Sequence, residues 1–223
     1  MSTIDYKEIL RYLDQYQGVP YSNPDKKGLT PAERSNFRNI REKAQVAVEE
    51  MKKIAKRCSE LYDLDKCSPI IWLDGTNVKT KRYLWAQMKH SEWENFPISI
   101  SVFVEKNNGV TRYRISLEIK TDGVDEKIMD LYHSHLDKKK EDGMVYVTNV
   151  TSSNEWGNPK SIDEDVESIK KKLATGEIQK VQLSIYVEQS KSKTNEQYDD
   201  EVMKAVRRLI PYYEYVMEKK TLI

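Results

Sequence analysis

Two stretches of alternating apolar and polar residues constrain the fold of this chain more than any other feature. Residues 98–104 read Ile-Ser-Ile-Ser-Val-Phe-Val, and residues 113–119 read Tyr-Arg-Ile-Ser-Leu-Glu-Ile. Between them, residues 107–109 read Asn-Asn-Gly. Two period-two runs on either side of an Asn-Gly turn are the strongest short-range signal for a β-hairpin. We therefore expect an antiparallel hairpin whose apolar side chains share one face.

Helical patterns occupy much of the remaining sequence. Thr30, followed by Pro31 and then Glu33, has the form of a capping box at the start of a helix. Apolar residues recur at helical spacing after it, so a long helix is expected over residues 31–61. Further helices are expected over residues 4–16, 124–140, 161–174 (with Ser161 as N-cap) and 196–220.

Strand patterns lie mainly in the middle of the chain. Besides the hairpin, strands are expected over residues 69–73, 83–88, 144–150 and 181–187. This order of elements predicts an α+β fold with a mixed or antiparallel sheet, in which the central hairpin is flanked by helices. We expect residues 1–63 to form an N-terminal helical arm and residues 64–223 an α+β domain, with one continuous domain as the alternative.

The composition limits the class of protein. Apolar residues make up 38% of the chain, charged residues 33%, and the formal net charge is +1. A protein coated in positive charge is excluded, but a local basic patch is not. No run approaches ~18 apolar residues, and no secretory signal is evident, so we expect a cytoplasmic protein without a membrane segment. Cys58 and Cys67 are expected to be reduced, with Cys58 in the core.

The common catalytic motifs are missing from the sequence. It contains no P-loop, no G-x-G-x-x-G and no G-x-S-x-G, so neither nucleotide hydrolysis nor serine chemistry is expected. The three histidines and two cysteines lack zinc-site spacing, and His133 and His135 are expected at the surface. We therefore expect no cofactor, no bound metal and no catalytic residue, and a binding domain rather than an enzyme.

One enzymatic alternative stays open. Glu118-Ile-Lys120 ends a predicted strand and matches the E-x-K half of the PD-(D/E)xK nuclease signature. That chemistry needs a second carboxylate near the start of the preceding strand, because two acids share a divalent ion. Residues 95–98 read Asn-Phe-Pro-Ile and supply none. A metal-dependent nuclease that uses Glu118 and Lys120 is accordingly a second alternative.

The segment before the hairpin interleaves basic and aromatic residues. Lysine and arginine contact DNA phosphates regardless of sequence, and aromatic rings stack on bases that have left the helix. The residues expected to bind the DNA backbone are Lys79, Lys81, Arg82, Lys89, Arg38 and Arg41. The residues expected to stack on an extruded base or line its pocket are Tyr83, Trp85, Trp93, Trp156, Asn77 and Asn154.

A structural interpretation stands beside each of these functional ones. Charged runs on helices are usually solvated faces, and this interpretation is favoured for Arg38 and Arg41. A place in the hydrophobic core is favoured for Trp72. For Trp85, the core and the base pocket are equal alternatives.

Several segments carry a resemblance to a known family. They are Trp-Ala-Gln-Met-Lys-His-Ser-Glu-Trp at 85–93, the strands at 98–104, 113–119 and 179–186, and the terminal helix at 199–213. Over residues 68–219 the chain resembles the N-terminal domain of the McrB family, the 5-methylcytosine-specific restriction enzyme B proteins. It departs from that family at residues 78–84, where Val-Lys-Thr-Lys-Arg-Tyr-Leu replaces a glycine-rich stretch of small residues.

The resemblance implies a DNA-recognition module of a modification-dependent restriction system. Such domains read modified cytosine by extruding the base into an aromatic pocket. The expected partner is double-stranded DNA carrying modified cytosine, with an NTPase motor and nuclease subunits supplying the other activities. The first alternative is a protein-interaction or scaffold domain of a defence complex, which the near-neutral net charge favours.

Overall fold

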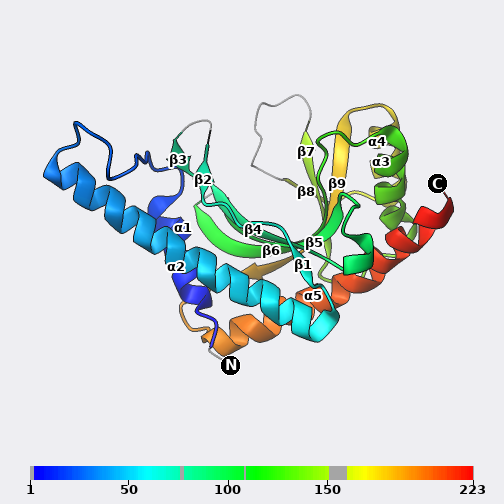
Figure 1. Cartoon of the computed structure of the whole chain (residues 1–223). Helices are drawn as coiled ribbons and strands as arrows, with labels where there is room; N and C mark the ends of the chain where they lie inside the picture. The colour runs from blue at the N-terminus through cyan, green and yellow to red at the C-terminus, as the bar shows by residue number, and fades with distance from the viewer. Residues whose placement is uncertain (1–2, 76–77, 108, 151–159, 223) are drawn as a thin grey trace.

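The structure, a computed structural model, describes residues 3–75, 78–107, 109–150 and 160–222 (Figure 1). The helices in this part of the chain are α1 (Tyr6–Tyr16), α2 (Pro31–Tyr62), α3 (Glu126–His133), α4 (Val166–Ala174) and α5 (Asn195–Glu218). The strands are β1 (Lys66–Cys67), β2 (Leu73–Asp74), β3 (Lys79–Thr80), β4 (Tyr83–Lys89), β5 (Ile98–Asn107), β6 (Val110–Ile119), β7 (Val145–Val150), β8 (Lys160–Ile162) and β9 (Ile178–Glu188).

Among the described residues, seven strands form one antiparallel sheet in the order β1-β4-β5-β6-β9-β7-β8. Strands β2 and β3 form a separate two-stranded ladder. The expected hairpin is confirmed as β5–β6, with Ile98 opposite Ile119 and Val104 opposite Tyr113. The predicted α+β class, with its central hairpin and long N-terminal helix, is also confirmed.

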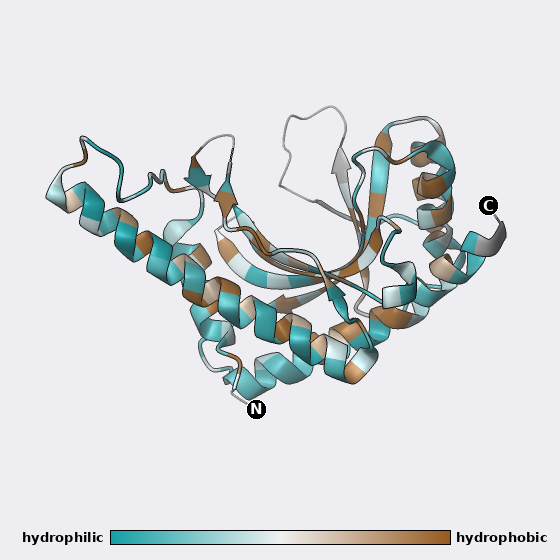
Figure 2. Ribbon diagram, in the orientation of Figure 1, coloured by the Kyte–Doolittle hydropathy of each residue, from teal (hydrophilic) through white to brown (hydrophobic). Residues whose placement is uncertain are grey.

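The sheet is curved, and α1, α2 and α5 lie on its convex side (Figure 1). Ile100 and Val102 of β5, with Ile115 and Leu117 opposite them on β6, are fully buried in the cluster that also holds the apolar faces of these helices. Figure 2 shows the alternation as bands of brown and teal along the strands. The polar residues between these apolar ones therefore lie on the concave face.

Buried tyrosines join α1 to the sheet and to α5. The Tyr113 hydroxyl on β6 donates to the Tyr6 carbonyl oxygen at 2.8 Å, and the Tyr6 hydroxyl donates to Asp199 Oδ1 at 2.8 Å. Residues of α1 and α2 belong to the same hydrophobic cluster as the sheet and α5. The domain boundary after residue 63 stays a prediction.

Helix α2 begins as expected. Thr30 Oγ1 accepts from the Glu33 backbone N–H, and Glu33 Oε2 accepts from the Thr30 N–H, which completes the capping box. The first buried residue of the helix is Ile40. Its N-terminal turns accordingly project beyond the sheet (Figure 1).

Three expected element boundaries are wrong. Residues 69–72 are not a strand: Pro69 lacks the N–H that a ladder needs, Ile71 is 51% exposed, and pairing resumes only at β2. Ser161 lies in β8 instead of capping a helix, because Asp165 accepts from the Ser168 N–H and starts α4 there. The helix expected over 124–140 is shorter, since α3 gives way to a 3-10 turn at Ser134–Asp137.

The histidines expected at the surface are packed between α3 and the sheet. His135 is fully buried, its Nδ1 lies 2.7 Å from the Tyr132 carbonyl oxygen, and its Nε2 has no partner among the described residues. His133 Nε2 accepts from the Val181 N–H at 3.4 Å. Burial lowers the pKa of His133 to about 3, helped by His135 and Lys180, and lowers the pKa of His135 to about 4. None of the described helices combines the length and apolar character that a membrane span requires.

The buried His135 and the half-buried His133 predict a loss of stability in mild acid. Their folded-state pKa values lie below the unfolded value of about 6.5, so their contribution is complete above that pH and is lost as the pH falls toward about 4. Each can cost up to ~1.4 kcal/mol per pH unit in that window. Urea unfolding at pH 7.5 and pH 5 should therefore show a smaller decrease for His135→Gln than for the unmodified chain. Equal decreases for the two proteins would contradict this account.

The tyrosine contacts predict a matched pair of stability effects. Tyr113→Phe removes the hydroxyl that bonds the Tyr6 carbonyl, so it should lower the free energy of unfolding by ~1–2 kcal/mol. Tyr12→Phe removes a buried hydroxyl without a hydrogen-bond partner in the described chain, so it should be neutral or stabilising. Urea titration of both variants tests this contrast, and equal losses would argue against it.

Candidate functional site

The concave face of the sheet carries most of the buried polar side chains in the described part of the chain. Cross-strand pairing fixes which residues share it. We define the concave face by Tyr83, Trp85 and Gln87 of β4; Ser99, Ser101, Phe103 and Glu105 of β5; Arg112, Arg114, Ser116 and Glu118 of β6; and Lys180, Gln182, Ser184 and Tyr186 of β9.

Three aromatic rings form a cluster at the β4–β5 end of this face. Trp85 pairs with Phe103 across the strands, with ring centroids 5.3 Å apart, and Tyr83 lies 6.1 Å from both rings. Tyr83 and Trp85 are partly exposed, whereas Phe103 is 4% exposed. Burial raises the pKa of the Tyr83 hydroxyl, and the nearby Glu118 adds to the shift. The cluster offers part-exposed π surface beside polar groups.

Arg114 connects this aromatic cluster to the polar centre of the face. Its guanidinium lies 4.0 Å from the centre of the Phe103 ring. Its Nε donates to Glu105 Oε2 at 2.9 Å, and its Nη1 donates to Ser116 Oγ at 2.7 Å and to Gln182 Oε1 at 3.2 Å. Arg114 and Glu105 are 4% and 6% exposed, so this is a buried ion pair with further hydrogen bonds around it.

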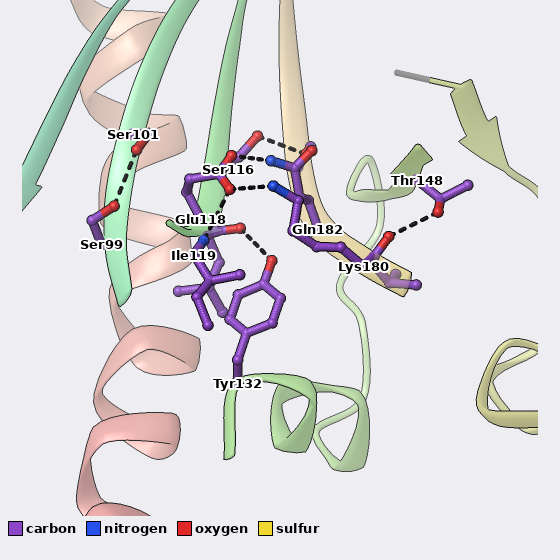
Figure 3. Close-up of polar contacts among 12 residues, drawn as sticks. Ser99, Ser101, Ser116, Glu118, Ile119, Tyr132, Thr148, Lys180 and Gln182 are labelled. Carbon is purple, nitrogen blue, oxygen red and sulfur yellow. Dashed lines mark hydrogen bonds and ion pairs between the residues drawn. The ribbon is translucent and has the colours of Figure 1, made fainter. Parts of the chain in front are cut away.

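Both oxygens of the Glu118 carboxylate accept hydrogen bonds from neighbouring residues (Figure 3). Lys180 Nζ donates to Oε1 at 2.7 Å, Gln182 Nε2 donates to Oε2, and the Ile119 N–H donates to Oε1 at 2.9 Å. Lys120 is exposed at the end of β6. Among the described residues, no three His, Cys, Asp or Glu side chains are grouped so that they could hold a metal ion.

Small side chains form the middle of the concave face. Ser101, Ser116 and Ser184 follow one another across β5, β6 and β9, and all three are fully buried. Ser116 Oγ lies 2.7 Å from Ser184 Oγ, and Ser101 Oγ lies 3.2 Å from Ser99 Oγ (Figure 3 shows the second pair). Gln87 faces Ser101 from β4. A row of short, polar side chains thus lies beside the aromatic cluster.

A basic arm lies next to β4. We define it as residues 21–41 together with the described residues of 73–82 (73–75 and 78–82), which contain eight lysines and arginines against three acidic residues. The two segments are joined at Tyr21, whose ring contacts Trp72 at 4.9 Å and Phe37 at 5.7 Å, and whose N–H donates to the Val78 carbonyl at 2.9 Å.

The arm brings together most residues expected to bind the DNA backbone. Lys79, Arg82 and Arg38 are exposed, and Lys81 and Arg41 are partly exposed. Lys81 Nζ lies 5.9 Å from the centre of the Tyr83 ring, so the arm reaches the aromatic cluster.

Two expected site residues lie apart from the arm and the aromatic cluster. Trp93 contacts His90 at 5.0 Å and Tyr213 of α5 at 5.1 Å, and packs against the hydrophobic core. Lys89 Nζ donates to the carbonyl oxygens of Glu94 (3.1 Å) and Phe96, and burial lowers the pKa of its ammonium. Asn77, Asn154 and Trp156 lie outside the described residues.

Sequence reasoning missed the residues that make the concave face distinctive. The apolar alternation that predicts the strands carries no signal for Phe103, Arg114 and Gln87, because these residues lie on the opposite face. A separate signal is present, since the residues between the apolar ones in the hairpin include Ser99, Ser101 and Ser116, which are unusually short for a solvent-facing strand surface.

Comparisons with known proteins identify no relative: no family model matches this chain, and neither does any curated protein or solved structure.

The buried ion pair predicts strong coupling between two residues. Among the described residues, Arg114→Leu leaves the buried Glu105 carboxylate with only Arg112 Nε as a cationic neighbour, at 3.8 Å. The substitution should therefore cost ~3–5 kcal/mol of unfolding free energy. Adding Glu105→Leu should recover at least half of that loss. Urea unfolding of the single and double variants measures the coupling, with exposed Arg82→Leu as control. Additive losses would contradict the buried pair.

Proposed function

We propose that this chain is a DNA-binding specificity module of a modification-dependent restriction system, and that it reads a modified cytosine extruded onto the concave face. One observation carries the proposal: the Tyr83–Trp85–Phe103 cluster lies on the sheet face opposite α1, α2 and α5, directly beside the basic arm. Aromatic rings and a phosphate-binding surface are the two parts that reading of an extruded base requires.

The electrostatics of the arm fit a DNA partner. The net charge of the whole chain is only +1, yet the arm carries eight basic against three acidic residues. Its exposed cations, Lys79, Arg82 and Arg38, project from separate segments that Tyr21 holds together. A localised basic surface attracts the DNA backbone without coating the protein in charge.

The resemblance to the McrB N-terminal domains suggests the biological setting. In that setting the chain supplies recognition, and separate NTPase motor and nuclease subunits supply movement and cleavage. The Glu118–Lys120 nuclease hypothesis gains no support, since the Glu118 carboxylate already accepts three hydrogen bonds.

A second candidate function is a protein-interaction domain of a defence complex. It is favoured by apolar side chains on the outside of α2 and near the β2–β3 ladder: Val46 is 44% exposed, Leu61 45%, Ile71 51% and Val78 55%. Exposed apolar side chains mark an interaction surface only where they form one patch, so these four residues give this candidate weak support. DNA binding discriminates the two candidates, because an interaction domain needs no salt-dependent affinity for a duplex.

The proposed function predicts that Trp85 contributes to DNA affinity and Trp93 does not. Fluorescence anisotropy would compare one duplex carrying unmodified, 5-methyl or 5-hydroxymethyl cytosine at two salt concentrations. We expect preference for a modified duplex and weaker binding at high salt. Trp85→Ala should reduce affinity for the preferred duplex by about 5- to 100-fold through lost stacking.

The control for this experiment is Trp93→Phe. The Trp93 indole packs against Tyr213, away from the arm. It should leave DNA affinity unchanged. Salt-dependent binding that ignores both the modification and Trp85 would indicate a basic surface without base reading. No binding under any condition would favour the interaction domain.

A further inference from the structure

Gln87 stands out among the polar residues of the concave face. The residue is 8% exposed. Its side-chain amide makes no hydrogen bond with a described residue, and its oxygen and nitrogen are not among the fully buried polar atoms, so the amide reaches the surface of the face. Gln182 on the same face is the opposite case, since its Oε1 accepts from Arg114 and its Nε2 donates to Glu118. The Gln87 amide is therefore available at the surface of the concave face to a hydrogen-bonding ligand.

The position of Gln87 links this amide to the aromatic cluster. Gln87 lies two residues after Trp85 on β4, so both side chains emerge on the concave face about 7 Å apart along the strand. Across the sheet, Gln87 faces Ser101, whose hydroxyl is near Ser99 Oγ. A planar group stacked on Trp85 would therefore present its edge toward the amide, over a row of short side chains.

We propose that Gln87 is the residue that reads the hydrogen-bonding edge of the extruded base. This inference rests on the proposed function and names the group that gives it base specificity. An amide presents an acceptor and a donor side by side, which matches the N4 amino group and N3 acceptor of cytosine. The C5 substituent lies off that edge, so Gln87 reads the base and leaves the modification to other contacts.

The test is a cycle between one substitution and one change in the DNA. Gln87→Leu keeps a similar side-chain volume and removes both hydrogen-bonding groups. The duplex carries either the preferred modified cytosine or an abasic site at the same position. We expect Gln87→Leu to weaken binding of the modified duplex by about tenfold or more, and to leave binding of the abasic duplex unchanged.

A matched control and a stability readout keep the test decisive. Gln45→Leu makes the same chemical change on the exposed side of α2 and should alter neither affinity. Because the Gln87 amide makes no hydrogen bond with a described residue, Gln87→Leu should keep or raise the midpoint of thermal unfolding. A variant that unfolds earlier would show that the amide is structural and would overturn the inference.

The remaining outcomes separate this inference from the proposed function. If the unmodified chain prefers the modified duplex but Gln87→Leu weakens both duplexes equally, or neither, then Gln87 does not read the base. If the protein without substitutions binds no duplex, the proposed function fails and this inference fails with it. The same holds if it binds duplexes with modified cytosine, with unmodified cytosine and with an abasic site equally well.

Discussion

The two faces of the β5–β6 hairpin set the rest of the structure, because each face imposes a different requirement on what lies against it. The apolar face, with Ile100, Val102, Ile115 and Leu117 fully buried, must be covered, and α1, α2 and α5 cover it. The other face buries charged and hydroxyl groups, so it must satisfy them internally. The Arg114–Glu105 pair and the hydrogen bonds to Glu118 meet much of that need, whereas Glu105 Oε1 and the Tyr186 hydroxyl have no hydrogen-bond partner among the described residues.

This difference between the two faces of the hairpin explains why the proposed site lies on the concave face. A solvent-facing sheet surface ordinarily carries long charged side chains and needs no buried network. Here the middle of the face consists of serines, flanked by guanidinium and aromatic groups that contact one another, as Arg114 and Phe103 do. The partly exposed rings of Tyr83 and Trp85 and the amide of Gln87 lie beside these serines, which is an arrangement suited to recognising a flat, polar molecule.

Features encoded locally could be predicted from the sequence. The hairpin and the Thr30 capping box depend on neighbouring residues, and both are confirmed. Residues 69–72 were misread because a short apolar run does not distinguish a strand from a packed loop. The separation of Trp93 from Trp85 depends on contact with Tyr213 at the far end of the chain, and the burial of His135 depends on how α3 meets the sheet. The Glu118–Gln182 contact likewise requires β6 and β9 to pair, and no local sequence pattern predicts that pairing.

The central claim, that a base stacks on Trp85, can be tested by fluorescence from a single tryptophan. A variant that keeps Trp85 and replaces Trp72, Trp93 and Trp156 by Phe would be titrated with the modified duplex, beside a variant that keeps only Trp93. Stacking on a base quenches indole emission, so we expect saturable quenching with Trp85 and little change with Trp93. Binding that leaves the Trp85 emission unchanged, or that changes both variants equally, would contradict the placement of the base on the concave face.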